Sequence, residues 1–219
     1  MKRPTALPIA SAAWRRRRLL ALGAGLPLLG ACASMLQSKE PRRFRLDGPT
    51  RFAPDLPTVA WTLEVDQTVA DPGIDTTRIA AIGSAGIELE YFADAEWPSR
   101  ASDMVNTMLL QAFVDSTRIA RVGDRNSGLR PDFVLKTVLR DFQVERGGTP
   151  TVKVTMTASL VELPRRIQAG MQRFQSTAPV ASSAIEDIVR GFETALDRVL
   201  ADLVAWTLVT GNGAHPPTG

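Results

Sequence analysis

Within residues 151–163, apolar and polar side chains alternate, and this pattern constrains the fold more than any other feature of the sequence. Threonine, lysine and serine occupy the positions between the apolar ones. A period of two is that of a β-strand with one face buried and the other in water. The sequence therefore predicts a long, half-buried strand here. Its apolar positions are Val152, Val154, Met156, Ala158 and Leu160.

The neighbouring segments extend this strand into an antiparallel meander. A second long strand is predicted over residues 133–145, and the glycines and proline of residues 146–150 supply the turn of a hairpin. Beyond a turn at residues 163–166, a third strand passes from Ile167 to Met171. Shorter strands are predicted at residues 58–66, 77–82 and 87–92, with turn formers such as Asp71 and Asp75 between them.

Two helices complete the predicted elements. The first begins near Pro98 and continues at helical spacing to Phe113. The second opens with Ser183 and Glu186, a capping box whose side chains satisfy free amides of the first turn. Its apolar stripe ends at Trp206 and spans only about three heptads, so packing on a sheet is favoured over a coiled-coil seam. The stripe comprises Ile185, Val189, Phe192, Leu196, Val199, Leu203 and Trp206.

These elements predict an α+β fold in a single domain over residues 44–210. The sheet is expected to be mixed and largely antiparallel, with the two main helices packed on it. A chain of 219 residues fits one such domain. The Gly- and Pro-rich residues 211–219 are expected to be a disordered tail.

The first 31 residues are typical of a signal peptide of lipoprotein type. A basic segment ends at Arg18, and the apolar run from Leu19 to Ala31 is too short to cross a hydrocarbon core of about 30 Å. Residues 29–32 resemble the bacterial lipobox, in which the cysteine is lipidated before cleavage. We expect Cys32, the only cysteine, to carry this fatty-acyl anchor. The arginines before Leu19 leave Sec and twin-arginine export both open.

Removal of residues 1–31 changes the inferred charge and location of the protein. The formal net charge of +3 becomes −3, because six basic and no acidic residues precede Cys32. The basic pI of about 9.5 therefore gives no argument for nucleic-acid binding. Residues 32–43 become a lipidated tether. Ala33 follows Cys32, where lipoproteins retained in the inner membrane resemble Cys-Asp, so we expect the inner leaflet of the outer membrane, facing the periplasm.

Residues that could support catalysis are scarce. The only histidine, His215, lies in the C-terminal tail, and the exported chain has no cysteine besides Cys32, so neither a nucleophilic triad nor a zinc site of Cys and His is expected. Glu88 and Glu90 lie on one face of a predicted strand. They could form the acid pair of a glycosidase, but a solvated face accounts for them more simply. We expect no catalytic, cofactor or metal site.

Three aromatic residues gather where a predicted strand meets the first helix: Tyr91, Phe92 and Trp97. Such a cluster can form a rigid, amphipathic contact surface for a protein or a lipid. The alternative is that Phe92 and Trp97 belong to the core beneath the helix. The sequence leaves both interpretations open.

A series of motifs over residues 44–208 resembles the ABC-type transport auxiliary lipoproteins, the group that includes paraquat-inducible protein C. The most specific is the cluster from Tyr91 to Trp97 with Asp94 inside it; Phe44 stands where the family often has tyrosine. The other matching segments are residues 44–46, 78–80, 131–135 and 158–161, with Phe142, Phe174 and Trp206.

This resemblance implies a non-enzymatic lipoprotein without a cofactor. Its implied partners are a substrate-binding protein of the mammalian-cell-entry type and, indirectly, an ABC permease and ATPase that move phospholipid or another hydrophobic molecule. The lipoprotein would tether this system to the outer membrane, and a homo-oligomeric ring would suit a symmetric partner. The alternative is an envelope lipoprotein that binds peptidoglycan or its synthases.

Overall fold

The computed structural model describes residues 40–163 and 165–214. The expected signal peptide, the lipidated Cys32, most of the tether and His215 lie outside these residues. The chain from Pro41 onward forms one compact unit.

Three long strands form the antiparallel meander that the sequence predicts. They are β7 (Phe133–Glu145), β8 (Thr151–Glu162) and β9 (Ile167–Pro179). β8 pairs with β7 along its whole length and with β9 on its other side. The apolar positions of β8 are buried and continue across the strands, since Met156 lies opposite both Leu139 and Phe174.

The other edge of β7 carries three short strands in succession, all parallel to it. β5 is antiparallel to the last of them, and two further strands extend the sheet. The sheet is therefore mixed, and the α+β prediction is confirmed. The sequence did not predict β1, β3 or β6. The short strands are β1 (Arg42–Arg43), β2 (Val59–Val65), β3 (Val69–Ala70), β4 (Arg78–Ile82), β5 (Leu89–Glu96) and β6 (Ile119–Gly123).

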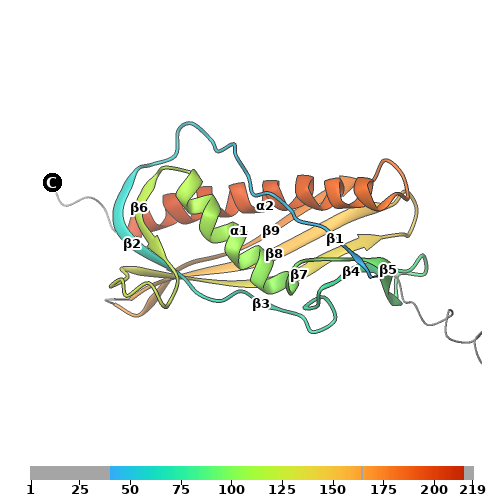
Figure 1. Ribbon diagram of the computed structural model, residues 1–219. Helices are drawn as coiled ribbons and strands as arrows, with labels where there is room; N and C mark the ends of the chain where they lie inside the picture. The colour runs from blue at the N-terminus through green and yellow to red at the C-terminus, as the bar shows by residue number, and fades with distance from the viewer. Residues whose placement is uncertain (1–39, 164, 215–219) are drawn as a thin grey trace, which may run out of the picture. The chain divides into compact units, whose positions relative to one another are not determined.

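Both helices cover one face of this sheet (Figure 1). α1 (Ala101–Asp115) connects β5 to β6, and α2 (Ile185–Ala214) lies along β8 and β9. One hydrophobic core fills the space between the helices and the sheet. At its centre the rings of Phe142 and Phe192 lie 4.7 Å apart, which joins β7 to α2. The amphipathic stripe of α2 packs on the sheet, as predicted.

An extended strap, residues 44–58, connects β1 to β2 by running across the helices (Figure 1). Two side chains of the strap itself, Leu46 and Leu56, are buried in the domain. The Arg118 guanidinium donates a hydrogen bond of 2.7 Å to the backbone oxygen of Pro54. The strap is therefore packed against the domain at several points along its length.

The predicted ends of α2 need two corrections. Glu186 forms an ion pair with Arg42 instead of a capping box with Ser183, and the hydroxyl of Ser182 accepts the Ala184 N–H at 3.1 Å. At the other end, the domain was expected to end at residue 210, but α2 continues four residues further, from Gly211 to Ala214. That glycine is buried because it packs against the Trp61 indole, where an added Cβ would lie 2.6 Å from the ring.

Candidate functional site

Trp97 lies in the core, which is the second of the two interpretations of the aromatic cluster. Its side chain is 1% exposed. The indole meets the Phe192 ring edge-on at a centroid distance of 5.1 Å and lies 5.6 Å from Phe142. The backbone N–H of Trp97 donates a hydrogen bond of 2.7 Å to the backbone oxygen of Thr77, which fixes the chain where β5 ends. A fully buried indole is not available to a partner.

Tyr91 is half-buried and held by its neighbours. Its hydroxyl donates a hydrogen bond of 2.8 Å to the backbone oxygen of Gly73. The Arg78 guanidinium lies 3.9 Å from the centre of its ring, a cation–π contact. The side chain therefore fastens the turn before β4 to β5.

Phe92 is also half-buried, and it borders an apolar cavity of about 260 Å³. Arg146 lies over its ring at 4.9 Å and forms an ion pair with Glu90. The cavity lies between β5, the turn after β7 and the first turn of α2. Its apolar walls are completed by Val144, Pro150, Val180 and Ile188.

Glu88 and Glu90 lie on the same side of the backbone, since a Cβ added to Gly83 would be 3.6 Å from Glu88 Cβ and 2.9 Å from Glu90 Oε1. Glu88 lies just before β5, which begins at Leu89, and Glu90 is bound to Arg146. The Asp71 carboxylate accepts the Gly73 N–H at 2.9 Å, which confirms its turn role. Asp75 does more than form a turn, because it accepts hydrogen bonds from the Ser102 N–H and hydroxyl and so caps α1.

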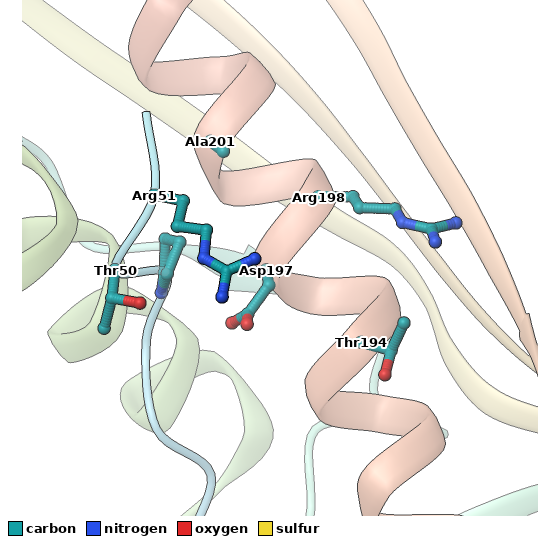
Figure 2. A pocket seen from close by; sticks show the side chains of 7 residues that line it. Thr50, Arg51, Thr194, Asp197, Arg198 and Ala201 are labelled. Carbon is teal, nitrogen blue, oxygen red and sulfur yellow. The ribbon is translucent and has the colours of Figure 1, made fainter. Parts of the chain in front are cut away.

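A polar pocket of about 530 Å³ lies between the strap and the middle of α2. Figure 2 shows Arg51 reaching from the strap toward Asp197 of α2, while Arg198 points away from that carboxylate. Among the described residues, neither guanidinium forms an ion pair within 4 Å, and Asp197 Oδ1 is buried without a hydrogen-bond partner. Thr50, Thr194, Pro49 and Ala201 complete the lining.

Burial raises the pKa of Asp197 to about 6, and the nearby carboxylates of Glu193 and Asp47 add to the shift. The pocket thus holds a carboxylate that titrates near pH 6. No pattern in the sequence indicates this carboxylate, because Asp197 occupies an ordinary polar position of an amphipathic helix. Only the fold brings Asp47 and Arg51 of the strap to this face of α2.

The described residues offer few groups for chemistry. They contain no cluster of three or more His, Cys, Asp or Glu side chains that could hold a metal ion. None of their helices is both long and apolar enough to span a bilayer. The two pockets can accept a small charged group beside Asp197 or an apolar group beside Phe92.

Proteins of known structure share this fold. The crystal structure of a Xanthomonas campestris protein is 28% identical, with a TM-score of 0.76 over 80% of this chain and 99% of that chain. An uncharacterised protein at 11% identity has a TM-score of 0.60 over 76% of this chain and 97% of its own, which shows the shared fold alone. No curated protein matches. The model of the ABC-type transport auxiliary lipoprotein component matches residues 45–204, and the chain belongs to this family.

Proposed function

We propose that this protein is the outer-membrane lipoprotein of an ABC-type lipid transport system. It tethers a periplasmic substrate-binding protein of the mammalian-cell-entry type to that membrane and catalyses no reaction. The observation that carries the proposal is the family match over residues 45–204. The lipobox cysteine with Ala33 after it supports an anchor in the outer membrane.

The start of the folded unit fits a tethering role. The chain between Cys32 and Pro41 is short. Even fully extended, it reaches at most about 32 Å. From there the chain enters β1, where the Phe44 N–H donates to the Glu96 oxygen at 2.9 Å and Arg42 pairs with Glu186 at 2.6 Å. A lipid on Cys32 would therefore hold this end of the domain close to the bilayer.

The cavities favour holding a partner over carrying cargo. The apolar cavity beside Phe92 has about 260 Å³, below the range of roughly 300–1,000 Å³ usual for small-molecule sites. The larger pocket beside Asp197 is lined mostly by charged and polar residues. The hydrophobic cargo would thus pass through the partner proteins.

Co-purification tests the partner assignment. The full-length lipoprotein, solubilised in mild detergent, should retain the mammalian-cell-entry protein encoded by the same genome. Absence of that protein from the complex, with the lipoprotein folded, would overturn the proposal. Sedimentation with isolated peptidoglycan serves as the comparison, since a peptidoglycan-binding lipoprotein would sediment and this one should not.

The anchor is tested separately with Cys32→Ser. This variant lacks the lipidated thiol, so it should remain unprocessed and leave the outer-membrane fraction. A Ser34→Ala variant changes a neighbouring tether residue and should fractionate like the wild type. Retention of the Cys32→Ser protein in the outer membrane would contradict the anchor.

A further inference from the structure

The start of β1 and two surface loops lie at opposite ends of the folded unit (Figure 1). β1 and the first turn of α2 are at one end, which we call the anchor end. Loop 124–132 and loop 163–166 are at the other, the free end, beside the last turns of α2. From Glu186 to Gly211, α2 advances roughly 37 Å. The free end therefore lies far from the point at which the tether enters.

The free end exposes apolar side chains. The Leu163 N–H donates to the Asp132 oxygen at 2.9 Å, which joins the two loops. Leu129 and Leu163 project from them with 38% and 37% exposure, and Ile167, at the start of β9, has 49%. Among the described residues, five of the nine exposed large hydrophobic side chains lie at this end. Met171 and Val209 are the other two.

Four acidic side chains of the free end already have partners, although the Oε2 atom of Glu162 is buried without one. Asp66 pairs with Arg125 at 2.7 Å, and Glu162 lies 3.5 Å from Arg165. Asp132 accepts the Thr62 N–H at 2.7 Å, and Asp124 accepts the Asn126 N–H at 3.0 Å.

Two arginines of the same loops remain available. Arg130 and Arg166 are exposed, and neither forms an ion pair within the described part of the chain. Arg166 has a φ of 54°, in the left-handed region that a bulky side chain rarely adopts. This loop thus holds an arginine outward in a costly backbone conformation.

We propose that the free end is a docking surface for an acidic, apolar patch on the periplasmic protein that this lipoprotein tethers. This inference rests on the proposed function and adds where the partner binds. The exposed Leu129, Leu163 and Ile167 supply apolar area, and the unpaired Arg130 and Arg166 select a partner that brings carboxylates. The position opposite the tether leaves the surface free when the lipid is in the membrane.

Binding is measured between the full-length lipidated protein in detergent and the purified periplasmic part of the mammalian-cell-entry protein. Leu163→Asp and Ile167→Asp should each weaken binding at least tenfold, because they place a carboxylate in the apolar contact. Arg130→Glu with Arg166→Glu should weaken it and reduce its dependence on salt. Ile87→Asp, at an 89% exposed residue of the anchor end, is the matched control and should bind like the wild type.

The outcomes separate the two proposals. Wild-type protein that fails to bind overturns the proposed function and this inference with it. Wild-type binding that all four free-end changes leave intact overturns the inference alone, provided that melting temperatures match. Vesicles of phosphatidylcholine and phosphatidylglycerol test the remaining alternative with a protein that begins at Ala33 and so carries neither the lipid nor the basic signal peptide. Vesicle binding that depends on Arg130 and Arg166, without an effect on the protein complex, would assign the free end to a membrane surface and overturn the proposal.

Discussion

Both the anchor end and the free end of the domain carry ion pairs, but the free end also has unpaired arginines beside exposed apolar side chains. At the anchor end, Arg42 binds Glu186, Arg146 binds Glu90, and Lys153 lies 3.1 Å from Glu145. At the free end, Arg130 and Arg166 have no carboxylate partner among the described residues. Opposed charges that are already paired give a partner little to recognise, whereas surplus charge beside exposed apolar groups can select one. This difference is the reason for proposing attachment at one end and recognition at the other.

The aromatic core near the anchor end is expected to be structural, and Trp97→Ala should have the largest effect. Loss of the buried indole leaves a cavity against Phe142 and Phe192 and should lower the free energy of unfolding by about 3–5 kcal/mol. Denaturant unfolding measures this change. Phe92→Ala, at a half-buried position, is the matched comparison and should cost clearly less. Equal losses would mean that Trp97 is not the core residue described above.

At the free end, Gly211→Ala should destabilise the domain by about 1–3 kcal/mol. Its new Cβ would lie 2.6 Å from the Trp61 ring, and overpacking exceeds the helix propensity that alanine gains. Gly213→Ala is the control, because a Cβ there meets nothing within 4 Å; it should be neutral or slightly stabilising. Thermal unfolding of both variants measures the difference. A stable Gly211→Ala protein would contradict the close packing of α2 on β2.

Between the two ends, the Asp197 pocket predicts a pH dependence. In the folded state the pKa of Asp197 is raised to about 6 from 3.8, so folding favours the protonated form. This group therefore lowers stability as the pH rises from 4 through 6, and the loss persists above pH 6. Asp197→Asn removes the penalty. It should stabilise the domain by about 1 kcal/mol at pH 8, after allowance for the partial exposure of the group, and have little effect at pH 4.

Thermal unfolding at the two pH values measures the Asp197 effect. Arg51→Gln is the companion variant, since it removes the positive charge that Figure 2 shows beside Asp197. It should lower stability at pH 8 or leave it unchanged. Destabilisation by Asp197→Asn at pH 8 would show that attraction to Arg51 outweighs burial.

The smallest effect is expected for the ion pair at the anchor end. The Arg42 hydrogen bond lowers the pKa of Glu186, so its contribution is present above pH 4.5 and is lost as the pH falls through the lowered value. Both side chains are about half exposed, so Glu186→Gln should lower the melting temperature only slightly at neutral pH. High salt should abolish even this difference. A large effect that persists in salt would mean that β1 depends on this pair.

The sequence predicted the elements whose patterns are local. The alternation in β7 and β8 and the stripe of α2 each reflect one buried face, so the meander and its helix were foreseeable. The parallel pairing of β2, β3 and β4 with β7 was not foreseeable, because the sequence of a short strand does not indicate which sheet edge it joins. Gly211 was assigned to the C-terminal tail, yet it lies in α2, where its small size allows packing against Trp61.

The candidate sites divide in the same way. Phe92 was predicted to lie at a contact surface and borders a cavity, while the neighbouring Trp97 belongs to the core. Asp197, Arg130 and Arg166 were not predicted, because their special feature is the absence of a partner in space. Whether a charged side chain lacks a partner is seen only once the fold brings residues distant in the sequence together.

Site-specific photo-cross-linking in intact cells tests the central claim most directly. A photoreactive residue placed at Leu163, at the free end, should cross-link the lipoprotein to the mammalian-cell-entry protein. The same residue placed at Ile87, at the anchor end, should not. Cross-links to that protein from Ile87 with none from Leu163 would contradict the division of the domain into an attached end and a recognising end.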